Sequence, residues 1–274
     1  MLLRDEWGTF WPRPLTLVSR SDGPRSLGVV SEHAVLREQQ SGQGVKEIAQ
    51  TQFKVGNRDV FGADYVWYRD EALTQASQPA EAVALERMEN GDFYGFLKAL
   101  RQGEAEVASG EAAWTRLQAE LPGVTRLRNQ VRVLQRDEVG RLNYQIRNAE
   151  LAIKAARLKG GAGAAEIGAQ EAVIEGAKKK YLSLTEEANA LTTQAATWVA
   201  VMETADGRTK EVPLASIVDL WRPNQMGFGE KLGHYLRHAW WFVSEEPRES
   251  NQEGGVFPAL FGTVMMTLIM TLAC

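Results

Sequence analysis

The first third of the chain alternates short apolar runs with turn residues. Residues 15–18, 27–30 and 64–68 are rich in β-branched and aromatic side chains, which is typical of strands. Asn90-Gly91 lies between two further apolar runs, residues 82–85 and 93–97, and an Asn-Gly pair in that position is a strong hairpin signal. This part is therefore predicted to be β-rich, with a short helix over residues 93–100 as the alternative.

The middle of the chain changes to a helical period. Residues 125–158 have helical composition, residues 160–163 form a glycine-rich break, and a second helix follows. Apolar residues in this second stretch recur at steps of three and four, which is the heptad pattern of a coiled coil. We therefore predict an antiparallel coiled-coil hairpin. The glycine-rich break is interpreted as a turn, because a phosphate-binding loop would need a preceding strand and a following Lys-Ser pair. The heptad positions are Ile174, Ala177, Tyr181, Leu184, Ala188, Leu191, Ala195 and Trp198.

The strand pattern returns near Thr197, with Asp206-Gly207 between two extended runs as a second hairpin signal. The coiled coil is therefore predicted to be an insertion into the β-domain. Residues 229–243 follow as an amphipathic, aromatic-rich helix.

The last nineteen residues, 256–274, contain no charged side chain. That length approaches the roughly 20 apolar residues needed to cross a bilayer, so a transmembrane helix is preferred over a buried soluble helix. Residues 245–253, just before it, carry one arginine and four glutamates, which is unfavourable for a cytoplasmic loop under the positive-inside rule. The body is therefore expected outside the cytoplasm.

Together these patterns predict an α+β protein: a β-rich extracytoplasmic domain, interrupted by a long antiparallel coiled-coil hairpin and followed by a C-terminal transmembrane helix. The expected divisions are residues 1–122 and 197–226 for the two parts of the β-domain, 123–196 for the hairpin, 227–254 for a membrane-proximal helix and linker, and 255–274 for the start of the transmembrane helix.

Composition adds few restrictions. The chain has 274 residues, 44% of them hydrophobic, and a formal net charge of −4, which gives no general affinity for nucleic acid. The single cysteine, Cys274, excludes an internal disulfide, which is compatible with the cytosol and with a bacterial periplasm. No signal peptide is recognisable, so the body is either cytosolic or preceded by a first helix that this chain lacks. Trp7, Trp11, Trp240 and Trp241 fit an interfacial belt or core packing equally well.

Candidate chemistry is sparse. His234 and His238 stand four residues apart on one helix face, which is the spacing of a paired metal site. The nearest acidic residue is Glu245, and the aromatic neighbours favour an interfacial helix instead. Neither a nucleophile elbow nor a zinc signature is present. We therefore predict no catalytic residue, no cofactor and no metal site.

Four segments resemble one known family. Residues 246–263, EPRESNQEGGVFPALFGT, resemble the junction before the second membrane helix of large proteobacterial phosphate ABC-transporter permeases of the PstA type. Residues 6–14 resemble the segment after the first membrane helix of these permeases, and Asn57-Arg58-Asp59 and residues 221–226 are also similar to the family. The junction residues are Glu246, Pro247, Arg248, Glu249, Gly254, Gly255, Pro258 and Gly262.

This resemblance implies a partial permease subunit of an ATP-driven phosphate importer in the bacterial inner membrane, with most of this chain in the periplasm. It also implies three kinds of partner: a sister permease, cytoplasmic ATPase subunits that hydrolyse ATP, and a periplasmic phosphate-binding protein. The chain itself is then not an enzyme. Its phosphate-pathway residues are unknown, because the later helices are missing. The alternative is a membrane-anchored periplasmic adaptor or scaffold that uses the coiled-coil hairpin.

Overall fold

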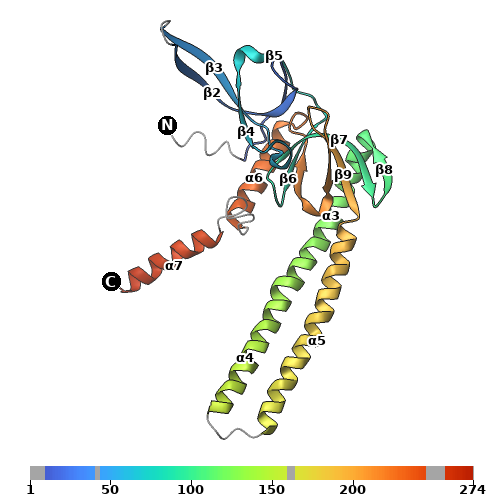
Figure 1. Cartoon of the computed structure of the whole chain (residues 1–274), viewed down its shortest axis with the longest axis vertical. Coiled ribbons are helices and arrows are strands. Elements are labelled where there is room, and N and C mark those ends of the chain that lie inside the picture. The colour runs from blue at the N-terminus through green and yellow to red at the C-terminus, as the bar shows by residue number, and fades with distance from the viewer. Residues whose placement is uncertain (1–9, 41–43, 159–163, 245–256, 274) are drawn as a thin grey trace. The chain divides into compact units, whose positions relative to one another are not determined.

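The computed structural model describes residues 10–40, 44–158, 164–244 and 257–273. They form helices together with two antiparallel sheets (Figure 1). The chain divides into two compact units. Unit 1 comprises Met1–Ala99, Ala200–Val212 and Ser216–Cys274, and unit 2 comprises Leu100–Val199 and Pro213–Ala215.

The five-stranded sheet belongs to unit 1 and has the strand order β4-β3-β2-β1-β5. Its long β2–β3 hairpin is prominent in Figure 1. Val18, Phe53, Val55 and Tyr68 form a buried cluster on this sheet. The strands are β1 Thr16–Arg20, β2 Ser26–Gln40, β3 Gly44–Lys54, β4 Tyr65–Arg69 and β5 Leu73–Ser77.

The six-stranded sheet has the order β10-β9-β7-β6-β11, and β8 pairs with β7. The predicted hairpin at Asn90-Gly91 is confirmed: β6 pairs antiparallel with β7, and both turn residues have positive φ, 65° and 66°. Asp206-Gly207 likewise lies between the neighbouring strands β9 and β10. The strands are β6 Ala82–Arg87, β7 Phe93–Gln102, β8 Ala105–Ser109, β9 Trp198–Glu203, β10 Thr209–Pro213 and β11 Ile217–Trp221.

Two helices of unit 1 bear on the site described below. The short α2, Arg58–Phe61, follows Asn57, and α6, Phe228–Ser244, confirms the predicted amphipathic helix. His234 on α6 is buried, whereas Trp240 on the same helix is exposed. Two segments form single turns of 3₁₀ helix, Asp70–Ala72 and Leu214–Ser216.

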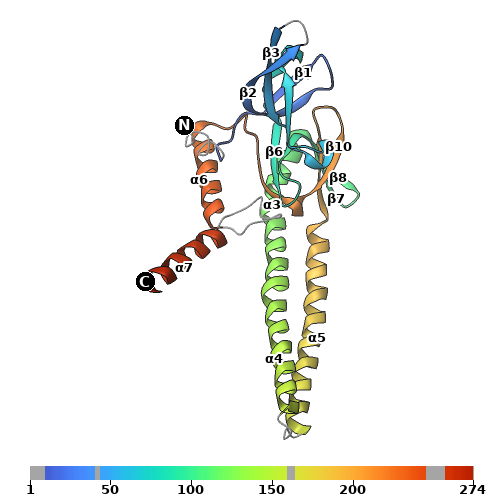
Figure 2. The ribbon, with the colours of Figure 1, turned by 60° about the vertical axis from the view of Figure 1, so that its left-hand side comes forward.

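Unit 2 contains the long helices. They are α3, Gly110–Val133, a π-helical turn over Leu134–Glu138, α4, Val139–Leu158, and α5, Ala164–Ala195. The helices α4 and α5 lie side by side (Figures 1 and 2). Small and medium side chains are buried where these helices meet, among them Leu142 and Ala149 on α4 and Ala177 on α5.

The predicted coiled-coil hairpin is wrong. The outgoing segment begins at Gly110 rather than near residue 125, and the π-helical turn Leu134–Glu138 interrupts it. A π-helical turn changes the helical phase, so a seven-residue repeat cannot continue through it. In the second helix, Tyr181 of the expected heptad seam is exposed, and Trp198 belongs to strand β9.

The predicted transmembrane helix is also wrong. The last helix, α7, Phe257–Ala273, has 17 residues. Among the helices that the structure describes, none combines the length and the apolar character that a membrane crossing requires. The fold class is therefore a mixture of helices with two antiparallel sheets. The division into domains by residue number remains a prediction.

Candidate functional site

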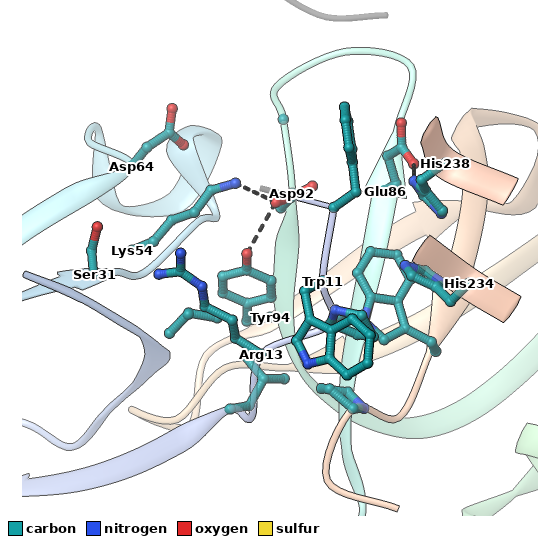
Figure 3. Close-up of a pocket in the computed structure, with 18 of the residues that line it drawn as sticks. Trp11, Arg13, Ser31, Lys54, Asp64, Glu86, Asp92, Tyr94, His234 and His238 are labelled. Atoms are coloured by element: carbon teal, nitrogen blue, oxygen red, sulfur yellow. Dashed lines mark hydrogen bonds and ion pairs between the residues drawn. The ribbon is translucent and has the colours of Figure 1, made fainter. Parts of the chain in front are cut away.

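A cavity of about 620 Å³ lies within unit 1 (Figure 3). Its walls come from segments that are distant in the sequence: the stretch before β1, strands of both sheets, and one face of α6. Polar and aromatic side chains are mixed along these walls. They include Trp11, Arg13, Lys54, Arg58, Glu86, Asp92, Tyr94, Trp221, His234 and His238.

Asn57 holds one wall together. Its side chain donates to the Tyr94 carbonyl at 2.9 Å and accepts from the Tyr94 backbone N–H at 2.7 Å. Asn57 is 1% exposed and has a φ of 55°, in the left-handed region where asparagine is better tolerated than most residues. Gly56 also has positive φ, and a Cβ there would lie 2.7 Å from the Asp92 carbonyl oxygen. The backbone before α2 is thus fixed tightly against β7.

A lysine, an aspartate and a tyrosine meet on this wall (Figure 3). Asp92 Oδ2 accepts from Lys54 Nζ at 2.5 Å and from the Tyr94 hydroxyl at 3.0 Å. Burial raises the pKa of Tyr94, and the charge of Asp92 adds to this. For Lys54, burial alone would lower the pKa, but the interactions with Tyr94 and Asp92 outweigh it and raise the pKa. Lys54 is therefore a positive charge held in place by Asp92.

The other two members of Asn57-Arg58-Asp59 make ion pairs. Arg58 binds Asp64 Oδ2 through Nε at 2.8 Å and NH2 at 2.5 Å. Asp59 receives a bidentate pair from Arg87 at 3.0 and 3.1 Å, and Lys210 at 3.0 Å. Burial acts to raise the pKa of Asp59, but the hydrogen bonds from Arg87 and Lys210 outweigh it and lower the pKa. Through Asn57 and Asp59 this tripeptide thus joins the start of α2 to strands β6, β7 and β10.

Asn224 joins the segment before β1 to the segment after β11. Its amide accepts from the Leu15 N–H and donates to the Leu15 carbonyl, both at 2.8 Å, and donates to the Pro79 carbonyl at 2.8 Å. These hydrogen bonds hold together two segments that are more than 200 residues apart in the sequence.

Aromatic rings connect the N-terminal segment to α6. Phe10 lies 5.2 Å from Phe242, and Trp11 lies 5.8 Å from Phe228 and 6.3 Å from Tyr235, measured between ring centroids. Trp11 therefore packs within unit 1, whereas Trp240 is 68% exposed. Trp7 lies outside the described residues.

Two histidines of α6 and an aspartate of β11 form a cluster beside the cavity. His238 Nε2 lies 3.0 Å from Asp219 Oδ2, and His234 Nδ1 lies 3.7 Å from the same oxygen. The two imidazole rings are stacked at a centroid distance of 4.0 Å. Arg237 NH2 donates to Asp219 Oδ2 at 3.0 Å, and Glu86 Oε2 lies 3.6 Å from His238 Nδ1.

The electrostatics of this cluster favour a neutral His234 and an ionised Asp219. Burial, together with the charge of His238, lowers the pKa of His234 to about 4. Burial of Asp219 would raise its pKa, but the hydrogen bond with His238 and the charge of Arg237 outweigh it and lower the pKa. The cluster thus presents one carboxylate and a lone pair on His234.

The family junction residues predicted from the sequence are not tested by the described part of the chain. Glu246, Pro247, Arg248, Glu249, Gly254 and Gly255 lie outside the described residues. Pro258 and Gly262 belong to α7.

Sequence reasoning found the histidine pair but missed Asp219 and Glu86. The spacing of His234 and His238 is local and readable, whereas β11 and β6 bring the two acids to it through strand pairing. The third histidine, His33, lies apart on β2, where it hydrogen-bonds with Thr51 at 2.9 Å.

Comparison with known proteins adds no relative: no family model, no curated protein and no solved structure matches this chain.

Proposed function

We propose that this chain is part of the permease subunit of an ATP-driven phosphate importer, and that its described body lies on the periplasmic side of the bacterial inner membrane. In this proposal the chain is not an enzyme, and ATP is hydrolysed by separate cytoplasmic subunits. A sister permease and a phosphate-binding protein are its other partners.

One observation carries the proposal. Three segments that each resemble the permease family lie far apart in the sequence, and all three line the same cavity. Trp11 and Arg13 come from the first, Arg58 from the second, and Trp221 and Pro223 from the third. Unrelated coincidental matches would have no physical reason to meet.

The contacts within these segments support the same conclusion. Asn57 and Asn224 each use their side-chain amide to hold a distant backbone segment. Buried amides with several backbone partners cannot be replaced without leaving polar groups unpaired. The matched residues therefore maintain the shape of one structure, as expected if the resemblance reflects a shared fold.

The test is uptake of radiolabelled phosphate by cells that carry the complete gene, the deleted gene, or point variants. We expect deletion to abolish high-affinity uptake and Asn224→Ala to reduce it several-fold. Asn148→Ala, at an exposed position of α4, is the matched control and is expected to leave uptake unchanged. Immunoblots of the membrane fraction would separate lost transport from lost protein.

Unchanged uptake after deletion of the whole gene would contradict the proposal. If deletion instead abolished assembly of another periplasmic complex, with uptake intact, the adaptor or scaffold function would be supported.

A further inference from the structure

We propose that Asp219, His234 and His238 bind a divalent transition-metal ion of the zinc class. His234 would bind through Nδ1, His238 through Nε2 and Asp219 through Oδ2. This proposal concerns unit 1 alone and does not depend on the transporter function.

The distances between the three ligand atoms support it. Zinc bonds to imidazole nitrogen and carboxylate oxygen are about 2.0–2.2 Å long, so ligand atoms around a tetrahedral ion are separated by roughly 3.3 Å. The carboxylate oxygen lies 3.0 Å from one imidazole nitrogen and 3.7 Å from the other, and all three ligand atoms lie within 4.8 Å of one another. Small rotations of the side chains suffice to place an ion between them.

The surroundings have the features of an outer coordination shell. A histidine that binds metal commonly offers its second ring nitrogen to a carboxylate, which orients the ring. Glu86 Oε2 lies 3.6 Å from His238 Nδ1, the ring nitrogen that does not contact Asp219, and Figure 3 shows Glu86 beside His238. The other oxygen of Asp219, Oδ1, accepts from the Leu220 N–H at 2.9 Å, which leaves Oδ2 for the ion. Trp221 and Trp241 flank the imidazoles at 4.6 and 5.0 Å.

Both histidines also line the cavity. Three protein ligands beside an open space are the arrangement in which zinc keeps an exchangeable fourth ligand, such as water or a small anion.

The guanidinium group of Arg237 would compete with the metal ion for these ligands. Its NH2 group lies 3.0 Å from Asp219 Oδ2 and 3.4 Å from His234 Nδ1, so a positive group already contacts two of the three proposed ligand atoms. The Arg237 side chain is 50% exposed and lies over the Trp241 ring, from where it can turn towards solvent. Metal binding is therefore expected to displace Arg237.

The test is titration of the untagged, chelator-treated full chain with Zn²⁺ by calorimetry and with Co²⁺ by ligand-field absorption. We expect one equivalent to bind and the melting temperature to rise by roughly 5 °C at 100-fold excess over Kd. His234→Ala and Asp219→Asn should each weaken binding at least tenfold. Arg237→Gln should strengthen it about tenfold, because the competing cation is removed. A purely structural role for the cluster does not predict that gain.

His33→Ala is the matched control, since it removes a histidine on β2, away from the cluster, and should leave the affinity unchanged. Equal binding by the wild type and a His234→Ala/His238→Ala double variant would overturn the proposal, as would no binding by the wild type. If the double variant fails to fold, X-ray absorption of the zinc-loaded wild type decides. Two imidazoles and one carboxylate, with or without a water or small anion, support the site, and any other set of protein ligands refutes it.

Discussion

Asn57 shows how one side chain can fix both a backbone conformation and a strand. We expect Asn57→Ala to lower the free energy of unfolding by about 3–5 kcal/mol, because two buried hydrogen bonds are lost and alanine is unfavourable at positive φ. Asn57→Gly loses the same two hydrogen bonds but has no conformational cost at positive φ. It should therefore lower the free energy of unfolding by about 1 kcal/mol less than Asn57→Ala does. Denaturant unfolding measures both.

The control for this pair is Asn90→Ala. Asn90 has a similar φ of 65° but is an exposed turn residue, so its replacement should cost only about 1 kcal/mol. Equal losses at the two positions would show that the contacts with Tyr94 do not stabilise the protein.

Asp59 should make stability depend on pH below the neutral range. Its pKa is lowered in the folded state, so its contribution is present above the ordinary carboxyl pKa of about 4 and is lost as pH falls through the folded value. Asp59→Asn should cost about 2–4 kcal/mol at pH 7, since Arg87 is left buried at 5% exposure of its side chain.

The measurement is urea unfolding between pH 3 and pH 7. As pH falls below about 4, towards the lowered folded pKa, the difference between Asp59→Asn and the wild type should shrink. A constant difference across this range would contradict the assigned ion pair.

At the scale of elements, the facing surface of α4 and α5 should tolerate truncation poorly. Leu142→Ala is expected to cost about 2–4 kcal/mol, because Leu142 is 4% exposed. Leu151, on the same helix, is 57% exposed, and Leu151→Ala should change stability by no more than about 0.5 kcal/mol. Comparable losses in thermal unfolding would show that the two helices do not bury this face.

The elements that could be predicted from the sequence are those that depend on interactions between residues close together in the chain. The turn at Asn90-Gly91 and the helix over Phe228–Ser244 depend on neighbouring residues, and both were predicted. The pairings of β1 with β5 and of β6 with β11 join distant segments and leave no local pattern. The π-helical turn Leu134–Glu138 contains no proline or glycine to mark it, so a regular helix was expected there.

The candidate site divides in the same way. The spacing of His234 and His238 was visible in the sequence, but nothing in the sequence indicates that Asp219, on the preceding strand β11, lies beside them. Likewise, Asn57-Arg58-Asp59 was noticed only as a family resemblance. Its role in holding β7 and Arg87 depends on contacts that the sequence does not record.

For the whole molecule, the two compact units suggest that part of unit 2 can be removed without unfolding unit 1. Lys180 Nζ on α5 lies 4.0 Å from Glu138 Oε2 at the end of the π-helical turn, so the chain runs side by side at these two residues. We expect a chain in which a short Gly-Ser turn joins Glu138 to Lys180 to keep unit 1 intact, because loop closure changes stability only slightly.

Hydrogen exchange with mass spectrometry can follow β2, β3 and β6 in the shortened chain. Unchanged protection of these strands is the expected result. Loss of protection throughout unit 1 would show that the two units unfold together.

The side-by-side packing of α4 and α5 also makes length an adjustable quantity. At 1.5 Å per residue, the 32 residues of α5 extend about 48 Å. Adding or removing matched turns in both helices lengthens or shortens the pair in steps of about 5.4 Å. A graded series of such chains would act as a molecular ruler. The length at which phosphate uptake fails would report the distance between the base of the helices and any partner that binds their far end.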